Sequence, residues 1–172
     1  GRTHVVGYSI RSTDGGTTWS GMVPLDGPPS SRQHMDQTEP CSVVTKDGKL
    51  MVLIRPIYSP WMWEPSSPDQ GRTWGPCVRG PFDGWAPSAP VRVQSGAVLF
   101  PTRFPGLTLH TTRDEGMTWD QGTYIDTSIW AMGALCEVAP DKVLFAYEDS
   151  WRDKLRMQFI QVTPAGLMPA VA

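Results

Sequence analysis

The stretch SSPDQGRTWG at residues 66–75 has two near-copies in the chain, RSTDGGTTWS at 11–20 and TTRDEGMTWD at 111–120. In chain order we name them the first, second and third Asp turns. All three contain the pattern Ser/Thr-x-Asp-x-Gly-x-Thr-Trp, and their tryptophans lie 55 and 45 residues apart. Self-similarity at such an interval predicts a repeat architecture in which each repeat forms one small sheet.

The composition excludes several classes of protein. The chain has 172 residues and a formal net charge of −2, with its lysines and arginines scattered, so we expect no nucleic-acid-binding surface. No apolar run reaches the length of about 18 residues that a membrane span needs, and residues 1–10 lack a signal-peptide layout. Cys41, Cys77 and Cys136 are widely spaced, which indicates buried thiols rather than disulfides or a zinc site. We expect no metal and no cofactor.

Short apolar runs separated by turn residues predict an all-β chain. Hairpins are expected at residues 41–55, 89–103 and 134–149, each around a turn rich in Gly, Asp or Pro. The expected blades lie roughly at 1–30, 39–84, 87–127 and 130–168, the first without its opening hairpin. Because a β-propeller needs at least about four blades, we expect three to four four-stranded blades, an incomplete ring and self-association that closes it.

The aspartates of the three turns are interpreted as structural. A short Asp or Ser/Thr side chain caps the backbone N–H groups of its own turn, and a glycine permits the positive φ where the chain reverses. The closing tryptophan is expected to bury its ring between sheets. The aspartates are Asp14, Asp69 and Asp114, and the glycines are Gly16, Gly71 and Gly116.

These motifs resemble the Asp-boxes of sialidases (neuraminidases) and of other propellers with bacterial neuraminidase repeats. The resemblance implies a sialidase-type β-propeller, of which this chain would be the carboxy-terminal part. It also implies a glycoside hydrolase that removes a terminal sialic acid or a similar acidic sugar. Such enzymes hold the sugar carboxylate with three arginines and use a tyrosine nucleophile assisted by a glutamate. The family's first arginine and its acid/base aspartate have no counterpart before the first Asp turn.

The segment TEPCSVVTKDGKLMVLIR carries the best match to the family's site. By resemblance, Glu39 is the base that activates the nucleophile and Arg55 is the second carboxylate-binding arginine. The alternative is that both are ordinary charged residues at strand ends. Arg103 is the nearest candidate for the third arginine, although its gap to the third Asp turn is about two residues longer than usual in the family.

The stretch DTSIWAMGALCEV departs from the family, because Trp130 stands where the nucleophilic tyrosine is expected. An indole has no hydroxyl and forms no glycosyl–enzyme bond. Tyr124 lies six residues earlier and Tyr147 lies seventeen later. Tyr147 is kept as a weak catalytic candidate and Trp130 as a substrate contact.

The segment YSPWMWEPSSPD contains an aromatic cluster, in which Trp61 is a candidate for stacking on a sugar ring, with burial in the core as the alternative. Two functions remain open. The first is a sialidase-like hydrolase with a sialoside or other acidic glycan as substrate. The second is a non-catalytic propeller that binds a glycan or a protein.

Overall fold

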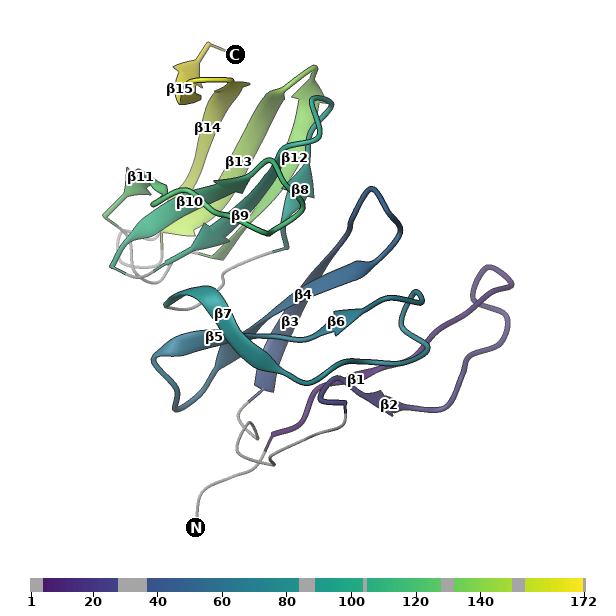
Figure 1. Cartoon of the computed structure of the whole chain (residues 1–172). Coiled ribbons are helices and arrows are strands. Elements are labelled where there is room, and N and C mark those ends of the chain that lie inside the picture. Colours follow the sequence, from purple (N-terminus) through teal and green to yellow (C-terminus); the bar gives the residue numbers. More distant parts are fainter. Residues whose placement is uncertain are drawn as a thin grey trace. The chain divides into compact units, whose positions relative to one another are not determined.

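The computed structural model describes residues 5–27, 37–83, 89–103, 105–127, 132–149 and 154–171. In these ranges the regular elements are β-strands in antiparallel sheets, and no helix is present (Figure 1). The predicted all-β class is thereby confirmed. The described part accordingly has no helix long and apolar enough to cross a membrane. The chain divides into two compact units, Gly1–Asp83 and Gly84–Ala172.

The first unit contains a two-stranded sheet and a five-stranded sheet. In the small sheet, β1 (Tyr8–Ser9) pairs with β2 (Val23–Pro24). The larger sheet has the order β3-β4-β5-β7, and β6 pairs with β4. Its strands are β3 (Gln37–Val44), β4 (Leu50–Pro56), β5 (Trp61–Glu64), β6 (Ser66–Ser67) and β7 (Val78–Asp83).

One hydrophobic cluster joins the two sheets of the first unit. Leu25 follows β2, whereas Val52 and Ile54 lie on β4, and all three side chains are buried. The cluster consists of Leu25, Val52, Ile54, Trp63, Trp74 and Cys77. Val52 and Ile54 are two residues apart on one strand, so they face the same side of the sheet, as the alternation of a strand requires.

The second unit consists of two four-stranded sheets, with the orders β11-β10-β9-β8 and β12-β13-β14-β15. The strands of the first are β8 (Val91–Arg92), β9 (Val98–Thr102), β10 (Leu107–Thr112) and β11 (Thr123–Asp126). Those of the second are β12 (Met132–Ala139), β13 (Lys142–Asp149), β14 (Lys154–Thr163) and β15 (Gly166–Ala170). Leu99 and Leu109 from one sheet pack in one core with Phe145 and Ile160 from the other.

Each Asp turn is closed by the same set of hydrogen bonds. In the second turn, the Asp69 carboxylate accepts bonds from the Thr73 amide (2.8 Å), the Thr73 hydroxyl (2.7 Å) and the Ser67 hydroxyl (2.9 Å). The Gly71 amide donates to the Ser67 hydroxyl at 2.7 Å. The first and third turns repeat all four bonds. The carboxylates therefore satisfy the backbone of their own turns.

Two consecutive residues in each turn adopt a positive φ. The expected one is the glycine, with φ 81° at Gly71. The residue before it is also left-handed, and it is a glycine only in the first turn. Gln70 (φ 59°) and Glu115 (φ 62°) carry side chains in this conformation, which residues other than Gly, Asn and Asp adopt reluctantly. The sequence pattern alone did not reveal this second position.

The three closing tryptophans differ in burial, which corrects the expectation that each ring is buried between sheets. Trp74 is 7% exposed, whereas Trp19 is 59% exposed. Trp119 is half-buried and meets the Phe100 ring edge-on, with 6.3 Å between centroids. Trp74 is covered because the cluster around Leu25 lies against it. Burial therefore depends on the neighbouring sheet and not on the turn.

The cysteines also differ from the expectation of burial. Cys77 is buried, Cys41 is half-buried and Cys136 is exposed. Cys136 pairs across the sheet with Leu144, on the face of β12 and β13 opposite to the buried Phe145.

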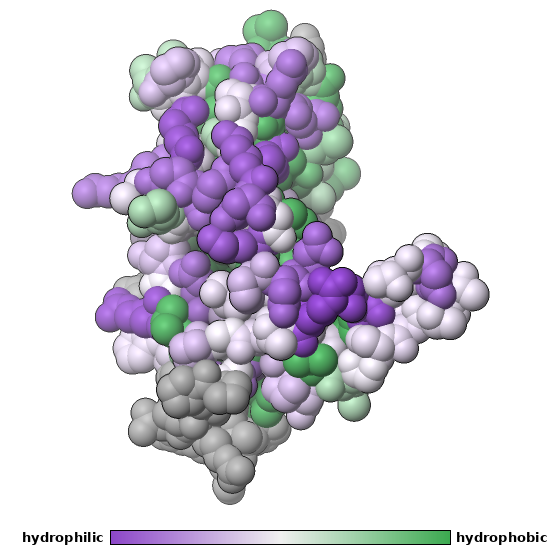
Figure 2. Space-filling model, turned by 45° about the vertical axis from the view of Figure 1, so that its right-hand side comes forward, coloured by the Kyte–Doolittle hydropathy of each residue, from purple (hydrophilic) through white to green (hydrophobic). Residues whose placement is uncertain are grey.

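Hydrophilic residues dominate the face of the molecule shown in Figure 2, with hydrophobic residues between them.

Candidate functional site

In the first unit, the structure brings Glu39 and Arg55 together where the start of β3 pairs with the end of β4. An Arg55 Nη1 atom lies 3.1 Å from Glu39 Oε1. The register shifts between Thr38 and Pro40, so Glu39 occupies an irregular position with φ 46°. This β-bulge directs the Glu39 carboxylate toward Arg55, whose own backbone pairs with Thr38.

The exposure of this ion pair is uneven. The Arg55 side chain is 22% exposed and the Glu39 side chain is 46% exposed. A half-exposed pair of this kind contributes little to stability, typically about 0–1 kcal/mol. Its main effect is therefore to hold the guanidinium in one orientation, and a planar guanidinium suits a carboxylate ligand.

Aromatic side chains lie on the neighbouring strand β5. Trp61 and Trp63 meet edge to face, with 5.8 Å between ring centroids. The Arg79 guanidinium lies 4.9 Å from the centroid of the Trp61 ring, so it covers one face of the indole. Trp61 also packs against the core cluster of the unit. Of the two readings of Trp61, core packing is the one that these contacts support more directly.

Glu64 is a candidate that the sequence analysis missed. The register places Ile54 opposite Trp63, so Arg55 and Glu64 lie on the same face of the sheet, diagonally across the β4–β5 pair. Burial raises the pKa of the Glu64 carboxyl. A carboxyl whose pKa is raised by burial keeps its proton to a higher pH than an exposed carboxyl. Nothing in the sequence around Glu64 distinguishes it from an ordinary strand residue.

In the second unit, Arg103 follows β9 directly and is 6% exposed. The Arg103 Nη1 atom donates a hydrogen bond to Met132 Sδ at 3.1 Å. The preceding residue, Thr102, shares a hydrogen bond of 3.2 Å with His110 Nε2. Burial lowers the pKa of His110, so this imidazole favours its neutral form. Arg103 is thus a deeply placed cation at one end of the β9–β10 hairpin.

Tyr147 is buried in a polar network. Its hydroxyl donates to Asp126 Oδ2 (2.9 Å) and accepts from Gln158 Nε2 (2.8 Å). Arg156 approaches the same Asp126 oxygen at 3.7 Å and bonds Asp149 at 3.1 Å. Burial, with the Asp126 carboxylate, raises the pKa of Tyr147 to about 12. A nucleophilic hydroxyl needs the opposite shift or an adjacent base that is free to accept its proton.

The remaining predicted residues are distributed differently. Tyr124 lies on β11 and is 56% exposed. Trp130 lies outside the described residues. Among the described ranges, no group of three or more His, Cys, Asp or Glu side chains is arranged to hold a metal ion. The structure therefore offers two separate sets of charged residues, one in each unit.

Comparison with known proteins gives information on the fold alone. No protein-family model and no curated protein matches the chain. Among solved structures, the Hadza microbial sialidase Hz136 superposes with a TM-score of 0.69 at 17% identity, over 94% of this chain and 39% of that one. The K499G mutant of NanB sialidase from Streptococcus pneumoniae gives 0.66 at 19% identity, over 95% and 27%.

A third structure broadens the comparison beyond sialidases. The α-L-arabinanase of Penicillium chrysogenum, complexed with arabinobiose, gives a TM-score of 0.56 at 16% identity, over 73% of this chain and 45% of that one. This chain thus spans less than half the length of each of the three. The sheets have the architecture of a sialidase-type β-propeller, which confirms the predicted fold class.

Proposed function

We propose that this chain belongs to a sialidase-like glycoside hydrolase of the Asp-box superfamily, acting on a terminal sialic acid or a similar acidic sugar. The observation that carries the proposal is the Arg55 guanidinium, fixed by Glu39 at 3.1 Å and still partly open to solvent. A fixed planar donor recognises a sugar carboxylate through two parallel hydrogen bonds. The sialidase folds among the similar structures support the same substrate class.

In this proposal Arg55 binds the carboxylate, and Glu39 orients Arg55 and takes the role of the base that the family resemblance gives it. Arg103 supplies a second cation for the same class of ligand. Tyr147 stays a weak catalytic candidate, because burial and the Asp126 carboxylate raise the pKa of its hydroxyl. Trp130 stays a predicted substrate contact at the position where the family has tyrosine.

The second candidate function is a non-catalytic propeller that binds a glycan or a protein. Tyr147 is the catalytic candidate of the second unit, and its buried hydroxyl is already held by two hydrogen bonds. This observation favours a function without catalysis. Under this alternative Arg55 still recognises an acidic sugar, but no glycosidic bond is cleaved. Where the ligand is an acidic glycan bound through Arg55, the two functions share the binding test and differ only in turnover.

The binding test uses the purified chain titrated with N-acetylneuraminic acid and followed by calorimetry. Replacing Arg55 by Ala removes charged hydrogen bonds worth about 1.5–3 kcal/mol, so binding is expected to weaken roughly 10- to 100-fold. Arg72→Ala is the matched control, because Arg72 is an exposed arginine of the same unit whose Nη1 atom donates to the Asp69 carbonyl oxygen in its own turn. Equal affinity of wild type and Arg55→Ala would contradict the hydrolase and any recognition of an acidic glycan through Arg55.

Turnover of a fluorogenic sialoside separates the two functions. Hydrolysis that Glu39→Gln abolishes, without loss of binding, supports the hydrolase. Binding through Arg55 with no hydrolysis supports the non-catalytic propeller.

Self-association to close the ring stays a prediction, and light scattering tests it: the expected mass is near twice the 19.0 kDa of one chain.

A further inference from the structure

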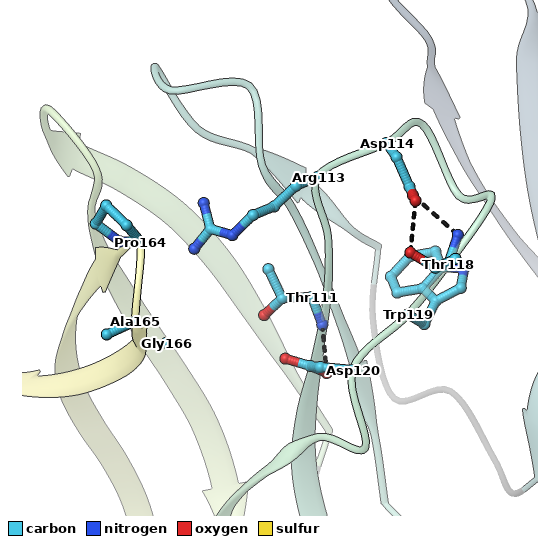
Figure 3. Close-up of a pocket in the computed structure, with 9 residues that line it drawn as sticks. All are labelled: Thr111, Arg113, Asp114, Thr118, Trp119, Asp120, Pro164, Ala165 and Gly166. Carbon is cyan, nitrogen blue, oxygen red and sulfur yellow. Dashed lines mark hydrogen bonds between the residues drawn. The ribbon is translucent and has the colours of Figure 1, made fainter.

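A pocket lies between the third Asp turn and the turn that joins β14 to β15, all within the second unit (Figure 3). Its volume is about 440 Å³, within the range of about 300–1,000 Å³ that small-molecule sites occupy. It contains neither the Glu39–Arg55 pair nor Tyr147. The lining residues are Thr111, Arg113, Asp114, Thr118, Trp119, Asp120, Pro164, Ala165 and Gly166.

The third Asp turn differs from its two sisters at the positions that line this pocket. Arg113 stands where the first and second turns have Thr13 and Pro68. Asp120, directly after the tryptophan, stands where they have serine and glycine. Because the bonds inside the three turns are the same, these charged residues are not needed to form the turn.

Arg113 extends from the end of β10 toward Pro164 (Figure 3). Its Nη2 atom donates to the carbonyl oxygen of Thr163, in the strand that leads into the facing turn. This bond fixes the guanidinium across the pocket with further N–H donors at its disposal, since a guanidinium carries five. The side chain is otherwise exposed, so a ligand in the pocket can reach it.

Asp120 and Thr111 supply oxygen atoms on the same wall. Asp120 Oδ1 accepts bonds from the Thr111 amide (2.9 Å) and the Gly122 amide (3.0 Å), which fixes the carboxylate. The Thr111 side chain is 8% exposed, and its hydroxyl has no hydrogen-bond partner in the described part of the chain. A buried hydroxyl without a partner is unfavourable unless a ligand or water bonds it.

The charges of the pocket select the class of ligand. The lining contains one arginine and two carboxylates, Asp114 and Asp120, so an anionic ligand meets a net negative environment. The Asp114 oxygens are already bonded within the turn. Donors from Arg113 and acceptors from Asp120 and Thr111, beside the half-buried Trp119 ring, are instead complementary to neighbouring hydroxyls on an apolar ring.

We infer that this pocket binds a neutral sugar unit, with Arg113 and Asp120 holding adjacent hydroxyls and Thr111 completing the hydrogen bonds. The site is lined by residues of the second unit alone and takes a ligand of different charge from the one proposed for Arg55. It does not depend on whether the chain hydrolyses a glycosidic bond.

The test is a titration of the ¹⁵N-labelled chain with lactose, a neutral disaccharide, followed by NMR. Lactose is expected to shift the amides of Thr111 and Gly166 and the indole of Trp119. Asp120→Asn keeps the oxygen that accepts from the Thr111 amide but removes the charge, and Arg113→Gln removes the guanidinium. Each is expected to weaken binding about three- to tenfold, the effect of a lost hydrogen bond.

Thr13→Ala, at the position equivalent to Arg113 in the first turn, is the matched control and is expected to leave lactose binding unchanged. Thr111→Val keeps the shape of the side chain, so it tests the site should Arg113→Gln unfold the protein. Three results overturn the inference: no shift with lactose, shifts that the pocket variants leave unchanged, or shifts at these residues with N-acetylneuraminic acid alone. Loss of N-acetylneuraminic acid binding in Arg55→Ala tests only the site proposed for the first unit, so the two proposals can fail independently.

Discussion

The first and second Asp turns have the same internal hydrogen bonds but opposite surroundings. The two turns share the same four hydrogen bonds, three to the aspartate and one from the glycine amide to the serine hydroxyl, at distances that differ by at most about 0.1 Å. The tryptophan that closes the second turn is 7% exposed, and the one that closes the first is 59% exposed. The comparison shows that the motif specifies the turn, whereas a neighbouring sheet decides whether the turn stabilises the core.

The second turn is bonded to the small sheet of its unit. Trp74 Nε1 donates to the Ser9 hydroxyl at 2.9 Å, and the Gly27 amide donates to the Gly75 carbonyl at 2.9 Å. Gly27 passes so close that a Cβ atom there would lie 1.7 Å from the Trp74 carbonyl oxygen. Trp19 Nε1, by contrast, donates to Gly16 O within its own turn, at 3.1 Å.

The largest expected difference between the two turns is that of their tryptophans. Trp74→Ala removes a buried ring and should lower the free energy of unfolding by about 3–5 kcal/mol. Trp19→Ala removes an exposed ring and should lower it by less than about 1 kcal/mol, within the range of surface substitutions. Urea unfolding of both variants measures the two values. Equal losses would mean that the first turn also packs against a sheet in solution.

Close approach of the chain at Gly27 provides the second test. Gly27→Ala forces the backbone away from Trp74 and should destabilise the first unit by about 1–3 kcal/mol, as overpacking does. Gly21, beside the first turn, has no atom within 4 Å of an added Cβ, so Gly21→Ala is the matched control. Thermal unfolding of the two variants should show a lower Tm for Gly27→Ala alone. A similar Tm for both would refute the close approach.

The residue before the turn glycine gives the third contrast. Gln70 is left-handed (φ 59°), at a position where the first turn has Gly15 (φ 69°). Relief of the left-handed strain, about 1–2 kcal/mol, outweighs the entropy lost by a glycine, about 0.5–1 kcal/mol. Gln70→Gly should therefore stabilise the protein by about 1 kcal/mol, and Gly15→Gln should destabilise it by a similar amount. A loss of stability in Gln70→Gly would contradict the argument.

The smallest expected effect is on acid stability, because the carboxylates are exposed and solvent screens them. Hydrogen bonds from Thr18 lower the pKa of Asp14 from 3.8 to about 2, and those from Thr73 do the same for Asp69. A pKa lowered in the folded state contributes stability above pH 3.8, which is lost as the pH falls toward 2. Asp69→Asn should flatten the fall of Tm over that window. An unchanged dependence of Tm on pH in Asp69→Asn would show that the hydrogen bonds of the turn do not lower the pKa of Asp69.

Much of the site geometry was not predictable from sequence. Glu39 and Arg55 were predicted as site candidates from the resemblance to the sialidase family, but the bulge that directs Glu39 toward Arg55 was not predicted. Glu64 was missed because nothing in the local sequence marks its burial, and the pocket at Arg113 was missed because Arg113 bonds Thr163, a residue 50 positions away. Tyr147 was considered for its position, whereas only the fold shows its bonds to Asp126 and Gln158.

The sequence by itself determined the three Asp turns and the all-β class. Each turn satisfies its own backbone through residues within ten positions of one another, and strand alternation is a local pattern. The tertiary structure alone decided which tryptophan is buried, which carboxyl has a raised pKa and where a pocket forms. These properties depend on burial and on charges brought together from separate strands, so no short stretch of sequence contains them.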